Sequence, residues 1–259
     1  MKVLSGVLKY EYGMSIRRWG VMAIYGVLGI FYLTILWPTA EDPVWSSLSQ
    51  IDLWKMAGQY AFSINVLMPV VAGIAAADRM ARDGSLKFDE LLRSTQLRRW
   101  PYVLGKFIGV LCSMLTPALI VTLLTSAVLV ARGSHPLLMV YSLAALLLIN
   151  LPAFAFVTAF SLACPMIMPV RVYQVLFTGY WYWGNFLSPK VMPTLTDTIL
   201  NAAGARALEG LFLGGHTVVF YNLTYSAVEA WLNILVVFAC AAAALIALER
   251  YLAWKANQG

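Results

Sequence analysis

The chain has 259 residues, of which 61% are hydrophobic and 12% are charged. A soluble domain carries about 25% charged and about 45–50% apolar residues, so lipid must solvate many of these side chains. The 18 Lys and Arg outnumber the 12 Asp and Glu, but they gather at the ends of apolar runs, which is typical of a membrane topology signal. A soluble protein and a nucleic-acid-binding face are therefore excluded, and an all-α membrane protein with a single transmembrane domain over residues 1–259 is predicted.

The N-terminal stretch 1–18 mixes basic residues with apolar ones at helical spacing, which predicts an amphipathic helix lying in the headgroup region. Apolar runs long enough to cross a hydrocarbon core of about 30 Å follow it. The six predicted spanning helices are 19–37, 57–77, 103–130, 137–163, 172–187 and 230–248. Gly105 and Gly109 form a GxxxG pattern at the start of the third helix, which permits close approach of another helix.

The basic residues predict the orientation. With the N-terminus inside and six spans, four basic residues lie outside, and the other fourteen lie inside. The four are Lys55, Arg132, Lys190 and Arg206. We therefore expect both termini to be cytoplasmic and 78–102 to be a cytoplasmic loop. The apolar but Gly- and Pro-broken stretch 188–229 is expected to be an external segment with one or two re-entrant or interfacial helices.

The sequence contains none of the usual hydrolytic motifs. It has no His-Glu-x-x-His site, no Gly-x-Ser-x-Gly elbow and no phosphate-binding loop, so we expect no catalytic, cofactor-binding or metal-ligating residue in this chain. Cys112, Cys164 and Cys240 are interpreted as apolar packing residues. Asn65 and Asn150 lie within spans and are expected to hydrogen-bond between helices.

The loop 78–102 is the most charged part of the chain. Gly84 is expected to break the outgoing helix, and a short helix is expected to begin at Ser85 and to lie along the membrane. Its charged face would suit a docking protein. The alternative is a solvated loop that carries only the topology signal.

One motif in this loop carries a family resemblance. The order Arg79, Gly84-Ser85-Leu86, Glu90-Leu91-Leu92, Arg98-Arg99, Tyr102 and Leu104-Gly105-Lys106 resembles the first cytoplasmic loop of ABC transporter permeases of the ABC-2 type. The overall plan is also similar, with an amphipathic N-terminal helix, six spans and a re-entrant segment before the last. The chain departs from the pattern at residues 94–97, where family members often have a proline.

The resemblance implies a permease subunit of an exporter in a bacterial inner membrane. The chain would pair with a second copy or a related permease. Separate cytoplasmic subunits would bind ATP and Mg²⁺ and supply the energy, because this chain has no ATPase site. The coupling residues that contact this ATPase would be Ser85, Leu86, Phe88, Asp89, Glu90, Leu91, Leu92 and Arg93. The expected substrate is amphipathic or lipid-like.

The fifth predicted span is rich in aromatic residues. Its run Tyr180, Trp181, Tyr182 and Trp183 offers apolar area with polar tips, and could line a substrate path. The alternative is an aromatic belt at the outer membrane interface. Two other functions also stay open for the whole chain: a membrane anchor or regulatory subunit that transports nothing, and an intramembrane enzyme.

Overall fold

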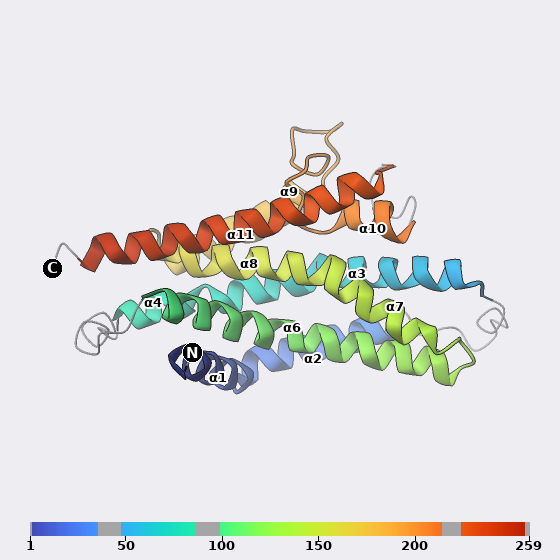
Figure 1. Ribbon diagram of the computed structural model, residues 1–259, viewed down its shortest axis with the longest axis horizontal. Coiled ribbons are helices and arrows are strands. Elements are labelled where there is room, and N and C mark those ends of the chain that lie inside the picture. The colour runs from blue at the N-terminus through green and yellow to red at the C-terminus, as the bar shows by residue number, and fades with distance from the viewer. Residues whose placement is uncertain (1, 36–47, 86–98, 214–223, 257–259) are drawn as a thin grey trace.

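The computed structural model describes residues 2–35, 48–85, 99–213 and 224–256. Within these ranges every regular element is a helix (Figure 1). The elements are α1 (Lys2–Ile16), α2 (Trp19–Ile35), α3 (Gln50–Ala76), α4 (Asp78–Ser85), α6 (Arg99–Ala131), α7 (Leu137–Ala145), η2 (Leu146–Asn150), α8 (Leu151–Ala163), η3 (Cys164–Met166), α9 (Val170–Phe186), α10 (Ala205–Phe212) and α11 (Ala227–Ala256).

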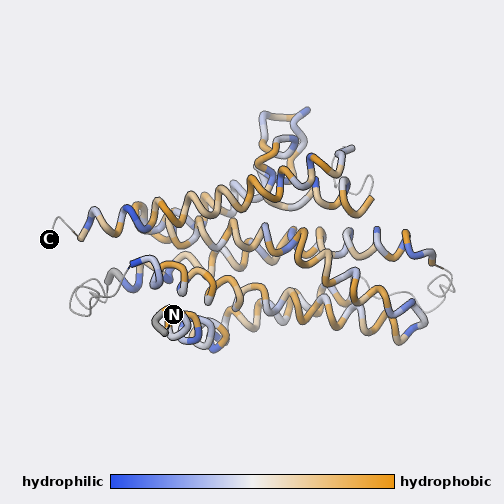
Figure 2. Tube along the Cα trace, viewed as in Figure 1, coloured by the Kyte–Doolittle hydropathy of each residue, from blue (hydrophilic) through white to orange (hydrophobic). Residues whose placement is uncertain are grey.

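The long helices run along one axis and form an elongated bundle, whereas α1 crosses this axis (Figure 1). Within the described ranges, four helices are long and apolar enough to cross a membrane, and the bent pair of α1 and α2 would make a fifth. The bend within this pair is 67°. Apolar residues colour the middle of the bundle and hydrophilic ones gather toward its two ends (Figure 2). The all-helical, membrane-type architecture predicted from composition is confirmed.

The two ends of the bundle have different contents. One end holds α4, the start of α6 and the end of α11, and we call it the α4 end (Figure 1). The opposite end holds the start of α3, the turn between α6 and α7, and α10, and we call it the α10 end. The last residue of α4, Ser85, and the first residue of α6, Arg99, both lie at the α4 end.

Several helices are longer than the apolar runs that predicted them. The second predicted span begins at Gln50 rather than at residue 57, because Ser49 caps the helix and Asp52 completes a capping box. The expectation that Gly84 breaks the outgoing helix is wrong, since α4 continues to Ser85. The last span, predicted as 230–248, extends over Ala227–Ala256. Polar residues at helix ends are compatible with the helix backbone, so hydropathy alone underestimates the helix length.

The fourth predicted span, 137–163, is divided into α7, a π-helical turn (η2) and α8. The π turn ends at Asn150, just before Pro152. Proline has no N–H to donate to the preceding turn, so a wide turn at this place lets the helix continue with a changed register.

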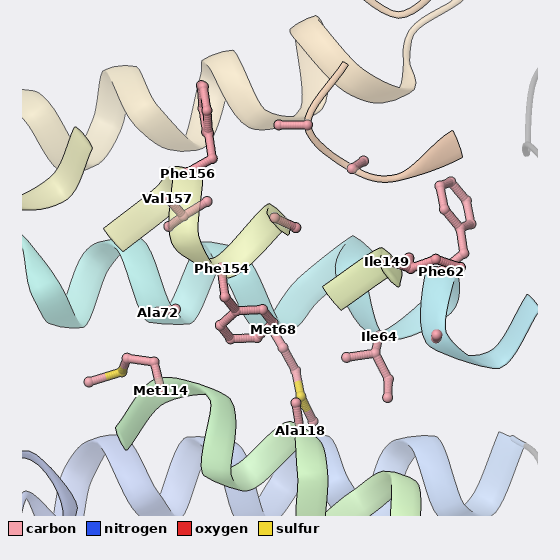
Figure 3. Packing of buried hydrophobic residues seen from close by; sticks show 14 of the residues in the cluster. Phe62, Ile64, Met68, Ala72, Met114, Ala118, Ile149, Phe154, Phe156 and Val157 are labelled. Atoms are coloured by element: carbon pink, nitrogen blue, oxygen red, sulfur yellow. The ribbon is translucent and has the colours of Figure 1, made fainter. Parts of the chain in front are cut away.

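The core is built where α3, α6 and α8 face one another. Phe154 of α8 points toward Met68 of α3, and Met114 and Ala118 of α6 lie below them (Figure 3). Phe156, two residues along α8, points to the opposite side (Figure 3). The two faces of α8 therefore serve different neighbours.

Helix α1 packs against the two glycines at the start of α6. A Cβ at Gly105 would lie 3.0 Å from the carbonyl oxygen of Leu4, and one at Gly109 would lie 2.7 Å from that of Leu8. The distance at Gly109 is too short for a side chain and that at Gly105 is tight, so the two glycines permit this close approach. The predicted close packing at the GxxxG pattern is confirmed, and its partner is the crossing helix α1.

The stretch predicted as a re-entrant segment, 188–229, contains one short helix, α10, within its described part. Residues 187–204 before it are irregular, and part of this segment stands out from the side of the bundle (Figure 1), whereas its end at Asn201–Ala203 is buried. Gly204, with φ of 89°, makes the left-handed turn into α10.

Candidate functional site

Most of the residues that the resemblance assigns to ATPase coupling lie outside the described ranges. These are Leu86, Phe88, Asp89, Glu90, Leu91, Leu92 and Arg93. Ser85 is the last residue of α4. The two helices that flank the segment, α4 and α6, are described, and their side chains show how the segment is attached to the bundle.

A group of charged side chains is buried between α1, α4 and α6. Lys106 is fully buried, and its Nζ lies 2.7 Å from Oε1 of Glu11 and 2.6 Å from Oδ2 of Asp83. Tyr102 donates its hydroxyl to the same Asp83 carboxylate. Arg79 adds a second buried cation, with Nη1 3.7 Å from Oε2 of Glu11. We call Glu11, Arg79, Asp83 and Lys106 the ionic cluster.

The ionic cluster is electrically neutral, with two carboxylates and two cations. This balance matters because a buried charge without a partner is costly, whereas a neutral group offsets much of the desolvation. The three side-chain nitrogens of Arg79 nevertheless make no hydrogen bond with any described residue. Arg79 is therefore held by charge and packing, and Lys106 by directed hydrogen bonds.

A second ion pair joins the corner between α1 and α2 to α4. Arg18 donates from Nη1 and Nη2 to the two carboxylate oxygens of Asp78, at 3.0 and 2.9 Å. Its side chain is 24% exposed and that of Asp78 is 41% exposed. Water screens this pair, so it contributes less than the ionic cluster.

The aromatic run at the end of α9 does not form one surface. Trp181 is completely buried, whereas Trp183 is 38% exposed. Tyr180 stacks on Phe156 of α8 with ring centroids 6.4 Å apart, and Tyr182 contacts Phe186 on its own helix. Successive helical residues point in directions about 100° apart, so the four side chains serve separate purposes and cannot all line one path.

Trp181 attaches α9 to α3. Its indole Nε1 donates to the backbone carbonyl oxygen of Asn65 at 3.1 Å. In a regular helix that oxygen would accept from residue 69, but Pro69 has no N–H. The indole takes the place of the missing donor, which explains how a proline is tolerated inside α3.

Five buried asparagines form a hydrogen-bonded group around the irregular segment before α10. Asn65 donates to the carbonyl oxygens of Ile149 and Ala203, at 3.1 and 2.9 Å. Asn185 accepts from the backbone N–H groups of Ala202 and Ala203, at 2.7 and 3.2 Å. The asparagine cluster is Asn65, Asn150, Asn185, Asn201 and Asn233.

The remaining members of the asparagine cluster extend the same pattern. Asn150 donates to Oδ1 of Asn65 at 2.7 Å. Asn233 of α11 donates to the carbonyl oxygens of Ile199 and Asn201, at 2.7 and 2.8 Å. Irregular backbone that is buried among apolar side chains needs protein partners for its polar groups, and the amides of Asn65, Asn185 and Asn233 supply them. The expectation that Asn65 and Asn150 hydrogen-bond between helices is confirmed.

Sequence reasoning did not identify the ionic cluster as a unit. Arg79 and Lys106 belong to the topology signal and the family motif, and no sequence pattern singles out Glu11. The sequence did hold one indication of the cluster, because Lys106 follows Gly105 and so lies close to the helix that packs against this glycine.

No protein-family model matches the chain, and a search of curated proteins finds no significant match.

Proposed function

We propose that the chain is the permease subunit of an ATP-driven ABC-2 type exporter, whose ATPase is a separate subunit that docks on residues 85–93 at the α4 end. In this arrangement α2, α3, α6, the α7–α8 unit, α9 and α11 are the six spans, and both termini are cytoplasmic. The 17 residues of α2 and of α9 are at the lower end of the range of about 17–25 that a spanning helix needs. A second copy or a related permease completes the pathway.

The ionic cluster is the observation that carries this proposal. It ties α4 and the start of α6, the two helices that flank residues 86–98, to each other and to α1. A force applied to this segment therefore acts on three joined helices rather than on a free loop. A solvated loop with no partner would need no such attachment, because its charges would be satisfied by water.

Copurification from native membranes tests the proposal. The intact chain should bring down a nucleotide-hydrolysing subunit in a fixed ratio, and Glu90→Lys or Leu91→Asp should release that subunit. Val191→Asp is the matched control, because Val191 is 80% exposed and lies in the irregular segment before α10. It should leave the complex intact.

Two results would overturn the proposal. One is purified chain that carries no ATPase subunit under conditions in which it stays folded. The other is an ATPase subunit that Leu91→Asp and Val191→Asp release equally. Stable association with a protein that hydrolyses no nucleotide would favour a membrane anchor or regulatory subunit.

A further inference from the structure

A cavity of about 410 Å³ lies among α8, α9 and α11. Phe156 and Phe160 of α8 form one wall, Tyr173 and Leu176 of α9 form another, and Cys240 of α11 lies on the third side. Nearly all of the atoms that line it are apolar. The volume is near the lower end of the range of about 300–1,000 Å³ that is usual for small-molecule sites.

The packing of α9 explains why the cavity exists. Trp181 and Gln174 both donate to backbone carbonyls of α3, so α9 is drawn toward α3. Meanwhile α11 packs along α8 and α10. The stack of Tyr180 on Phe156 joins α9 to α8 across part of the space that is left. Leu195 and Leu200 of the irregular segment cover the side toward the α10 end.

The lining selects the kind of molecule that fits. The Tyr173 hydroxyl is already hydrogen-bonded to Ser161 at 2.9 Å, so it offers little to a polar ligand. Water gains too few hydrogen bonds in an apolar cavity to fill it. A flexible hydrocarbon chain fits this lining, and in a membrane such chains are the surrounding solvent.

The start of α9, which carries the cation Arg171, adjoins the end of the cavity that is away from its leucine cover, because Met168 and Tyr173 on either side of it in the sequence both line the cavity. Met168 lines the cavity there, and the exposed Arg171 follows it three residues later, in the first turn of α9. No side chain caps the start of α9, so its first N–H groups add to the positive potential at this place. An anionic headgroup would complement both.

From this geometry we propose that the cavity binds one acyl chain of an anionic phospholipid, with the headgroup beside Arg171 in the leaflet at the α4 end. The use of this lipid as the exported substrate rests on the proposed function. The binding itself requires only that the chain spans a membrane.

Photolabelling tests the binding with the full chain in vesicles, without nucleotide. The probe is phosphatidylglycerol with a diazirine in the middle of one acyl chain. Labelled peptides should contain Phe156–Phe160, Leu176–Tyr180 or Cys240. Filling the cavity with Cys240→Phe should lower this labelling about tenfold, which corresponds to the loss of about 1.4 kcal/mol of binding free energy.

The chain offers matched controls for that variant. Cys240→Ser keeps the volume of the side chain, and Cys112→Phe adds the same ring on an exposed face of α6. Both should label as the unchanged protein does. Leu176→Trp is a second filling variant, since Leu176 is 58% exposed and tolerates a larger side chain without repacking the core. It should lower the labelling even if Cys240→Phe does not fold.

The headgroup is tested by exchanging the probe. Phosphatidylcholine with the same diazirine chain should label the cavity several-fold less, and Arg171→Gln should remove the difference between the two probes. Equal labelling by both probes in the unchanged protein would overturn the anionic assignment. Stronger labelling by a free diazirine fatty acid would overturn the assignment to a phospholipid.

Ordinary boundary lipid would label exposed helix faces evenly, such as that of Val27 on α2. Such even labelling, unchanged by Cys240→Phe and Leu176→Trp, would overturn the site. The result is separable from the proposed function. Cavity labelling without an ATPase partner would keep the lipid site and overturn the exporter, and an ATPase partner without cavity labelling would do the reverse.

Discussion

The ionic cluster and the asparagine cluster both bury polar side chains, but they use different chemistry. Near the α4 end, full charges are buried in neutral combination, with Lys106 between Glu11 and Asp83. Deeper in the bundle, uncharged amides such as Asn65 and Asn185 satisfy the carbonyl and N–H groups of an irregular segment. A buried charge costs more than a buried amide, so the charges near the α4 end are gathered in a neutral group, whereas the amides satisfy the backbone of the irregular segment.

Removing one member of the ionic cluster should have the largest effect. Glu11→Ala leaves Arg79 and Lys106 with a single carboxylate, and we expect the free energy of unfolding to fall by about 3–5 kcal/mol, as for other broken buried ion pairs. Denaturation in mixed micelles measures it. The neutral double variant Glu11→Met with Arg79→Met keeps the pair of Lys106 and Asp83 and should recover much of the loss. An unchanged unfolding midpoint for Glu11→Ala would show that the cluster is not tightly coupled.

Removing an amide should have a smaller effect, because no charge is left unpaired. Asn185→Leu removes the acceptor of the Ala202 N–H and one of the two acceptors of the Ala203 N–H, and the loss should be about 1–3 kcal/mol. Hydrogen exchange at Ala202 and Ala203 should accelerate in this variant. Gln174→Leu, which removes one hydrogen bond at an exposed residue, is the control and should leave that exchange unchanged. Equal exchange in both variants would contradict the anchoring role of Asn185.

The close packing of α1 against α6 brings Glu11 to the ionic cluster. A steric change at this contact therefore tests how tightly α1 is held. Gly109→Ala would place a Cβ against the backbone of Leu8, and we expect a loss of about 1–2 kcal/mol as the two helices separate. Gly6→Ala meets nothing within 4 Å and should be neutral or slightly stabilising because alanine favours the helix. Thermal unfolding of the two variants in the same detergent compares them directly. A similar midpoint for both would mean that α1 is loosely held.

The exposed ion pair should have the smallest effect. Arg18→Gln removes the pair with Asp78, and the expected loss is at most about 1 kcal/mol, because solvent screens both groups. The loss should vanish at high salt, whereas the loss from Glu11→Ala should persist because the ionic cluster is buried. Unfolding at low and high ionic strength distinguishes the two. Equal salt sensitivity of both variants would remove the contrast between the surface pair and the buried cluster.

Local patterns predicted the helices well and their neighbours poorly. Long apolar runs located the membrane-type helices, and Gly105 and Gly109 correctly indicated close packing, because both signals lie within a few consecutive residues. The partner of those glycines was not predictable, since Leu4 and Leu8 are about one hundred residues away. The same limit applies to the candidate sites. Trp181 looked like one of four equivalent aromatics, and only the contact with α3 separates it from Trp183.

The proline at position 69 has one more consequence. Because Pro69 has no N–H, the carbonyl oxygen of Asn65 lacks its usual donor within α3, and the indole of Trp181 donates to it at 3.1 Å. A slide of α9 by a single residue would move the indole by about 1.5 Å along the axis and break the contact. Pro69 thus helps to fix the position of α9 along α3, and a slide of α9 requires that the hydrogen bond between Trp181 and Asn65 break.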